Sequence, residues 1–152
     1  MIRYASDIDV SRPAEEAFAA VLDITRWGEW TEMRDIRAQQ GGPPRVGTTG
    51  TFTVPGPFKG PIHFELTALE PNRRVEYRLT HPGFDWRAEV DVEPRPGGSR
   101  LTNWGEYRLL GWRRVLEPIV AREIRNGEAA ELPRLKALIE ASPAGAPAAA
   151  EA

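Results

Sequence analysis

Two predicted strands carry polar side chains on the face that their pattern marks as buried. In "SRLTNWGEYRLL" (residues 99–110) the charged residues define an outer face, so Asn103 and Tyr107 point inward. In "RRVEYRLT" (residues 73–80) Tyr77 shares the inward face. Apolar walls with a few placed hydrogen-bonding groups are typical of a small-molecule pocket. The alternative is that the tyrosine hydroxyls reach the rim and Asn103 satisfies the backbone at a bulge. The sequence leaves both open.

The last predicted helix raises a similar question. In "IRNGEAAELPRLKALIEA" (residues 124–141) a rotation of about 100° per residue puts Gly127 and Glu131 on the side of the leucines. A helical glycine costs about 1 kcal/mol relative to alanine, and a buried carboxylate needs partners or a raised pKa. One interpretation is that this face looks into a cavity. The other is that Pro133 breaks the helical phase and leaves Glu131 in water.

Histidines, the usual general bases near neutral pH, number only two. His63 lies between Ile62 and Phe64, so parity places it outward. His81 precedes Pro82, which favours a structural role at a turn. No spacing of histidines and carboxylates fits a metal site, and neither a phosphate-binding glycine loop nor G-x-S-x-G occurs. We therefore expect no metal and no cofactor. If the chain is an enzyme, the candidate catalytic residues are Tyr77, His81, Asn103, Tyr107 and Glu131.

The composition excludes several classes of function. The chain has 152 residues, 41% hydrophobic and 28% charged, which suits one soluble globular domain. A net charge of -2 gives no reason to expect nucleic acid or an anionic membrane as partner. The lack of cysteine excludes disulfides and thiolate sites. No segment approaches the roughly 18 apolar residues of a membrane span, and residues 1–10 lack a signal-peptide pattern. We therefore expect a cytoplasmic protein.

The beginning of the chain reads as a strand followed by two short helices. Residues 2–10 alternate in polarity, as in a half-buried strand. Pro13 suits the first turn of a helix. Thr25 suits the cap of a second short helix that carries Trp27 and Trp30.

The middle of the chain predicts an antiparallel sheet. Strong alternation of apolar and polar residues indicates strands with one buried face, and short segments rich in Gly and Pro separate them. We expect six further strands, at 34–40, 48–54, 61–69, 73–80, 84–93 and 99–110.

The end of the chain returns to helical periodicity. A helix is expected from Trp112 to Ala141, with Pro118 and Pro133 as kinks or breaks. A single sheet needs its apolar face covered, and this helix is the element available. The prediction is one α+β domain over 1–141, followed by a flexible Ala/Pro-rich tail over 142–152.

These segments resemble a known superfamily. "VSRPAEEAFAAVLDITRWGEWTE" followed by "GGPPRVGTTGTF" resembles the opening of the START-like (SRPBCC) superfamily, and "LPRLKALIEA" resembles its usual helix ending. The superfamily includes the polyketide cyclase/dehydrase family, plant allergen-type carriers and lipid-transfer domains. The resemblance implies a helix-grip fold, in which a curved antiparallel sheet of about seven strands wraps around the long helix and leaves a hydrophobic tunnel. It does not imply one chemistry.

Three functions follow from this resemblance. The first is binding of a hydrophobic small molecule, aromatic, polyketide-like or lipid-like, by a monomer or homodimer. The second is a cofactor-independent cyclase, aromatase or dehydratase, and the third is a co-chaperone-like interaction domain. The predicted ligand-binding residues are Phe52, Phe64, Tyr77, Leu79, Trp86, Ala88, Asn103, Tyr107, Val120, Ile124, Gly127 and Glu131.

Overall fold

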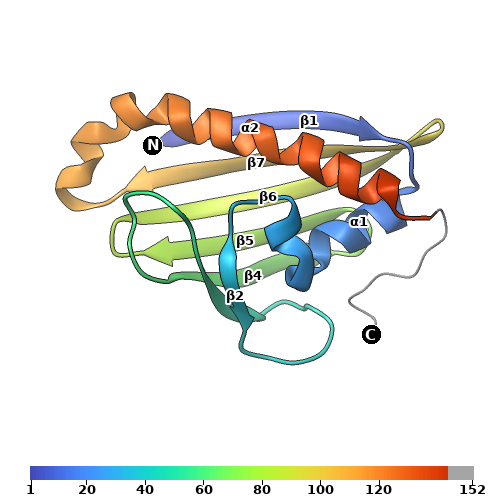
Figure 1. The fold of residues 1–152 in the computed structure, drawn as a ribbon, viewed down its shortest axis with the longest axis horizontal. Coiled ribbons are helices and arrows are strands. Elements are labelled where there is room, and N and C mark those ends of the chain that lie inside the picture. The colour runs from blue at the N-terminus through green and yellow to red at the C-terminus, as the bar shows by residue number, and fades with distance from the viewer. Residues whose placement is uncertain (144–152) are drawn as a thin grey trace.

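One antiparallel sheet and one long helix make up most of the fold (Figure 1). The computed structural model describes residues 1–143, so all but the first two residues of the predicted tail lie outside the described part. The seven strands follow the order β1-β7-β6-β5-β4-β3-β2, which pairs the first strand with the last. They are β1 (Ile2–Val10), β2 (Arg34–Ala38), β3 (Thr49–Thr53), β4 (Ile62–Glu70), β5 (Arg74–His81), β6 (Phe84–Arg95) and β7 (Gly98–Leu109).

Four helical segments lie on one side of this sheet. The long helix packs against β1 and β7, while the first helix packs against β6 and β7. They are α1 (Ala14–Leu22), the 3-10 helix η1 (Ile24–Glu29), the 3-10 helix η2 (Gly111–Leu116) and α2 (Glu117–Ala141). This arrangement confirms the predicted helix-grip architecture. None of the helices in residues 1–143 combines the length and apolar character needed to cross a membrane.

Alternation along the strands separates a buried face from a charged face. On β5, Val75 and Leu79 are buried, while Arg78 between them is exposed. Arg78 forms an ion pair with Asp85 of β6 at 2.9 Å. A register shift by one residue would exchange the two faces, so this pattern fixes the pairing.

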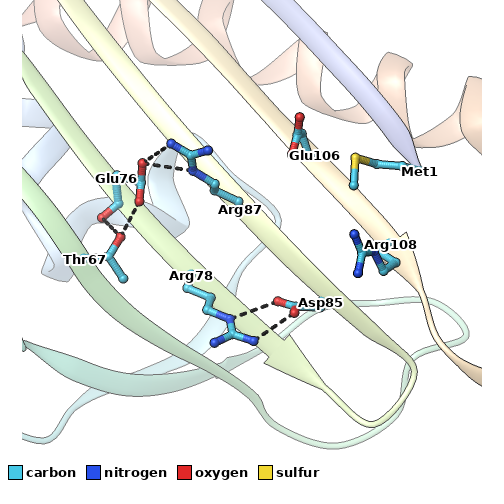
Figure 2. Close-up of a pocket in the computed structure, with 8 residues that line it drawn as sticks. All are labelled: Met1, Thr67, Glu76, Arg78, Asp85, Arg87, Glu106 and Arg108. Carbon is cyan, nitrogen blue, oxygen red and sulfur yellow. Dashed lines mark hydrogen bonds and ion pairs between the residues drawn. The ribbon is translucent and has the colours of Figure 1, made fainter.

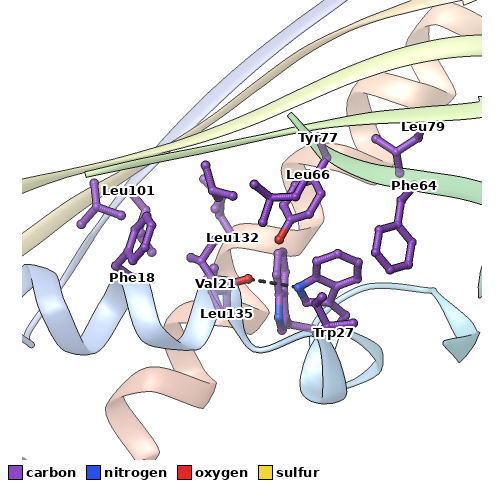
Figure 3. Close-up of a cluster of buried hydrophobic side chains, with 14 of the residues drawn as sticks. Phe18, Val21, Trp27, Phe64, Leu66, Tyr77, Leu79, Leu101, Leu132 and Leu135 are labelled. Atoms are coloured by element: carbon purple, nitrogen blue, oxygen red, sulfur yellow. Dashed lines mark hydrogen bonds between the residues drawn. The ribbon is translucent and has the colours of Figure 1, made fainter. Parts of the chain in front are cut away.

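The core lies between the concave face of the sheet and the helices (Figure 3). Trp27 of η1 stands at its centre, with ring centroids 5.2 Å from Phe64 and 5.1 Å from Tyr77, both in edge-to-face geometry. Its indole nitrogen donates to the carbonyl of Val21 at 3.0 Å, so the polar atom of this buried ring is satisfied. The same cluster contains Leu132 of α2.

The long helix differs from its prediction in two respects. Its first turns, Gly111–Leu116, form a 3-10 helix, and α2 proper begins at Glu117. Of the predicted kinks or breaks, a break at Pro133 is wrong, because α2 continues through it, and Pro118 lies in the first turn of α2. Proline removes the hydrogen bond to the carbonyl four residues earlier. That residue, Ala129, is exposed, as is Pro133, so water can satisfy the carbonyl.

A smaller correction concerns the cap of η1. The cap is Asp23 and not Thr25, because the carboxylate of Asp23 accepts a hydrogen bond from the Thr25 backbone N–H at 3.1 Å. An aspartate at this position satisfies an N–H that the helix itself leaves free.

Candidate functional site

A chamber of about 60 Å³ lies between the sheet, the segment around η1 and the middle of α2. Its walls are mostly apolar and aromatic, and its polar groups come from β1, β5, β7, α2 and the residues that follow η1. Six residues predicted from the sequence line it: Tyr77, Leu79, Trp86, Ala88, Asn103 and Glu131. The parity of the strands therefore located most of the sheet side of the chamber.

Two small residues, Gly105 and Ala88, sit side by side in the middle of the sheet, and of these Ala88 lines the chamber. Gly105 of β7 pairs with Ala88 of β6 on one side and with Tyr4 of β1 on the other. A Cβ atom at Gly105 would lie only 2.4 Å from the Tyr4 hydroxyl oxygen, so the Tyr4 ring leans over the glycine. Ala88 in turn pairs with Tyr77 of β5. Tyr4 thus fills the space above Gly105, while Ala88 and Tyr77 both line the chamber.

Glu128 of α2 is the most enclosed carboxylate of the chamber. It is only 8% exposed, and the Tyr107 hydroxyl donates to its Oε1 at 3.2 Å. Burial raises the pKa of Glu128 to about 7. Hydrogen bonds with Tyr107, Asn103 and Tyr4 lower it in part, because they stabilise the charged form. Glu128 therefore holds a proton that is exchangeable near neutral pH.

Tyr4 connects this carboxylate to the aromatic wall. The indole nitrogen of Trp86 donates to the Tyr4 hydroxyl at 3.0 Å, which leaves the hydrogen of that hydroxyl for Glu128. Tyr107 stacks on Trp86, with ring centroids 4.4 Å apart. Burial, and after it the charge of Glu128, raises the pKa of both tyrosines well above the usual value. The two hydroxyls therefore act as donors to Glu128 and not as bases.

Glu131 stands one turn further along α2, where the chamber approaches the surface. It is half-buried, like Met33 across the rim. Burial, and after it the charge of Glu128, raises the pKa of Glu131 to about 9, while Arg134 opposes this shift. The negative charge of Glu32, in the loop after η1, also raises the pKa of Glu131. The interpretation that left Glu131 in water is wrong, because the helix keeps its phase through the proline.

Two buried donors that belong to chamber residues have no protein partner. The indole nitrogen of Trp30 and the hydroxyl of Tyr77 make no hydrogen bond within residues 1–143. Both side chains are more than nine-tenths buried, at 6% and 8% exposure. A buried donor without a partner costs about 1–3 kcal/mol. Both donor atoms are themselves covered by neighbouring groups, so a bound molecule reaches them only when one of these groups moves.

Several predicted residues lie elsewhere. Phe52 and Phe64 are fully packed core residues. Val120 and Ile124 are half-buried and do not line the chamber. Gly127 is exposed, and a Cβ built on it meets nothing within 4 Å. The expectation that this glycine opens space inside the protein is therefore wrong.

His81 has the structural role that its position before a proline suggested. Its Nδ1 accepts from the Gly83 backbone N–H at 2.9 Å, and its Nε2 contacts the Lys59 carbonyl at 2.8 Å. The ring stacks on Phe84 and meets Phe58 edge-on. Nδ1 is thus bonded within the β5–β6 turn, Nε2 ties this turn to the β3–β4 loop, and the side chain does not reach the chamber.

Sequence reasoning missed Glu128 and the residues that close the chamber from the helical side. The buried positions of α2 are Glu128, Leu132, Leu135 and Ile139, which recur at helical spacing. The steps from Leu132 to Leu135 and Ile139 were a usable signal, because extending them backwards by four residues reaches Glu128. The chamber residues that were not predicted are Tyr4, Val21, Trp27, Trp30, Thr31, Met33, Val90 and Glu128.

A second hollow, of about 260 Å³, lies on the charged outer face of the sheet (Figure 2). Its side chains are largely paired with one another: Arg78 with Asp85 at 2.9 Å, and Glu76 with Thr67 at 2.8 Å. Such cross-strand pairs are typical of a solvated sheet surface. Apart from Met1, the side chains that line this hollow are polar or charged, in contrast to the aromatic lining of the chamber.

Comparison with known proteins agrees with the fold. TTHA0849 from Thermus thermophilus superposes with a TM-score of 0.74 at 13% identity, over 93% of this chain and 99% of that chain. CV1439 from Chromobacterium violaceum superposes with a TM-score of 0.67 at 19% identity, over 92% of this chain and 99% of that chain. Ara h 8.0201 superposes with a TM-score of 0.68 at 14% identity, over 92% of this chain and 98% of that chain. No curated protein shows a significant match.

These identities are low, so the solved structures establish the fold alone. The sequence match is more specific. A family model described as "Polyketide cyclase / dehydrase and lipid transport" matches residues 1–140, which include every strand and nearly all of α2. With its sheet wrapped around that helix, the chain belongs to the polyketide cyclase/dehydrase and lipid transport family.

Proposed function

We propose that the protein binds a compact, largely apolar small molecule in the chamber beneath α2. The observation that carries this proposal is an aromatic-lined hollow in which two buried donors, of Trp30 and Tyr77, have no partner within residues 1–143. Small-molecule sites combine apolar walls with a few convergent polar groups in this way. The family description, which covers cyclases, dehydrases and lipid transport, supports the same conclusion.

The size of the chamber limits the ligand. At about 60 Å³ it is well below the roughly 300–1,000 Å³ of typical ligand sites. A one-ring molecule therefore suits it better than a long acyl chain, and even a single ring requires a wall to move. Met33 and Glu131 are half-buried lining residues outside the sheet, and we expect a ligand to enter between them.

Filling the chamber tests the proposal. Ala88→Leu places a larger side chain in the hollow, and we expect it to abolish the binding of one-ring aromatic compounds. Ala129→Leu makes the same change on the exposed side of α2 and should leave binding intact. Binding is followed by tryptophan fluorescence, because Trp27, Trp30 and Trp86 line the chamber. Unchanged binding by the Ala88 variant would place the ligand elsewhere.

A second candidate function is supported by the hydrogen bond between Tyr107 and Glu128. A carboxyl group with a pKa near 7 beside a tyrosine donor suits proton transfer to and from a substrate. The corresponding reaction class is a cofactor-independent cyclisation or dehydration. In that case Tyr107→Phe changes the product distribution while the ligand still binds, whereas a carrier shows saturable binding and no turnover with either side chain.

A further inference from the structure

The chamber contains two carboxylates and no basic lining residue. Glu128 and Glu131 lie three residues apart on α2 and both line the hollow. Among the described residues that line it, none is arginine, lysine or histidine. Carboxylates in apolar surroundings are expensive to ionise unless a cation or several donors compensate. The site therefore holds acidic groups without the counter-charge that would normally accompany them.

The groups that act on this pair come from every element packed around it. Tyr4 of β1 and Tyr107 of β7 donate neutral hydrogen bonds to Glu128. Glu32, after η1, adds negative charge near Glu131. Arg134, one turn further along α2, is the cation that acts on Glu131, and its side chain is exposed outside the chamber. No lining residue of the chamber therefore places a positive charge beside the two carboxylates.

The aromatic walls of the chamber also favour a positively charged ligand. Trp27, Trp30 and Trp86 line the chamber with Tyr77. The face of an aromatic ring attracts an ammonium group, most strongly in the case of tryptophan. A carboxylate pair framed by indole rings is favourable for a cationic nitrogen and unfavourable for an anion. The volume of about 60 Å³ restricts the rest of the guest to a small apolar body.

We propose that the chamber selects a compact apolar amine, whose protonated nitrogen is held by Glu128 and Glu131. This inference rests on the proposed ligand-binding function and adds the chemical class of the ligand. The ring of the amine lies against the indoles, and its nitrogen donates to the carboxylate oxygens. Binding a cation favours ionisation of the pair, so a proton leaves Glu128 or Glu131 as the amine enters.

Three ligands of similar size and different charge test this selection. Phenethylamine is cationic, phenethyl alcohol is neutral and phenylacetate is anionic near neutral pH. At about pH 8 we expect the amine to bind about tenfold more tightly than the alcohol, because charge-assisted hydrogen bonds exceed neutral ones. Phenylacetate should bind most weakly. At about pH 5 the preference for the amine should disappear, since the carboxyl pair is then protonated.

Variants on α2 assign the preference to the two carboxylates. In the double variant Glu128→Gln, Glu131→Gln we expect the affinity for phenethylamine to fall to that for phenethyl alcohol, with the alcohol affinity retained. Glu123→Gln removes the same kind of charge from an exposed position of α2 and should change neither affinity. Calorimetry in buffers of different ionisation enthalpy should detect proton release when the amine binds to the unaltered protein, and none in the double variant.

The outcomes separate this inference from the function on which it rests. If phenethyl alcohol binds as tightly as phenethylamine, the chamber binds apolar molecules without selecting an amine, and the inference is overturned while the proposed function stands. An amine preference that survives in the double variant would also overturn it. If none of the three compounds binds, the proposed function fails and the inference with it.

Discussion

Glu128 is the residue whose protonation links the site to the stability of the fold. Burial raises its pKa from an ordinary value of 4.5 to about 7. Between these two values the folded state holds a proton that the unfolded state has lost. The free energy of unfolding therefore falls as the pH rises through this window. A pKa shift of this size corresponds to a change on the order of 3 kcal/mol in the free energy of unfolding.

Glu128→Gln removes this dependence, because the amide does not titrate. We expect the variant and the unaltered protein to differ least near pH 4.5, the ordinary value for glutamate. The variant should gain stability relative to the unaltered protein up to about pH 7. Urea unfolding at a series of pH values measures this. Glu123→Gln, on the exposed side of α2, provides the control. Parallel pH profiles for Glu128→Gln and the unaltered protein would show that Glu128 has the same pKa in the folded and unfolded states.

Two glycines give opposite predictions for the same substitution. A Cβ at Gly105 would lie 2.4 Å from the Tyr4 hydroxyl and 2.5 Å from the Arg87 carbonyl oxygen, and the latter is backbone that moves only with the strand. We therefore expect Gly105→Ala to destabilise the protein by about 1–3 kcal/mol. Gly127, with nothing within 4 Å of a Cβ, lies in the middle of α2.

Gly127→Ala is thus the matched control, and helix propensity predicts a gain of about 0.5–1 kcal/mol. The midpoints of urea unfolding distinguish the two variants. Displacement of Tyr4 also breaks its contact with Trp86, so the near-ultraviolet circular dichroism of Gly105→Ala should change while that of Gly127→Ala does not. A stable Gly105→Ala protein with an unaltered spectrum would contradict the close packing of Tyr4 over the sheet.

At the scale of elements, alternation predicted the sheet almost completely. The strand predicted over residues 2–10 is β1, and the weaker strands at 34–40 and 48–54 appear as the shorter β2 and β3. Alternation succeeds because every inward side chain of a one-sided sheet must be apolar or enclosed. The same parity placed Tyr77, Trp86 and Asn103 on the chamber.

The helical side of the site was predicted less well, for a physical reason. From Glu117 to Gly127 no residue of α2 within the described chain is fully buried, so this half carries little information about which face turns inward. Extending the phase from Ile124 therefore selected Gly127 in place of its neighbour Glu128. Trp30 was missed for a different reason. Its approach to the sheet depends on how η1 packs, which local periodicity does not encode.

For the molecule as a whole, the distribution of buried residues predicts which wall yields to a ligand. The strands of the sheet hold one another through backbone hydrogen bonds along their length. Beyond Glu128, α2 is fixed by Leu132, Leu135 and Ile139 in the core. The preceding part is different: Val115 and Ile119 are exposed, as is Trp112 at 69%.

Polar contacts nevertheless hold this half of α2. The Arg125 Nε donates to the Arg3 carbonyl of β1 at 2.9 Å, and the start of the helix is anchored by Glu117. Glu117 accepts a hydrogen bond from the Leu109 backbone N–H at 3.0 Å and pairs with the N-terminal amino group. The segment from Pro118 to Gly127 is therefore held by a polar contact and by the half-buried Val120, without a fully buried residue. Segments with little buried apolar surface open at lower free energy than the core. Enlarging the chamber thus costs least by displacing this half of the helix.

Hydrogen exchange measured by mass spectrometry tests this prediction. We expect the amides of residues 118–127 to exchange faster than those of residues 132–141, although both stretches belong to one continuous helix. A one-ring ligand bound in the chamber should slow exchange around Glu128 and Glu131 and in the rim segment that carries Met33, while β5 and β6 remain unchanged. Ala88→Leu, with the chamber filled, should show no ligand effect. Exchange that is equally slow along all of α2 would mean that the helix is a rigid wall, in which case only guests that fit about 60 Å³ could enter.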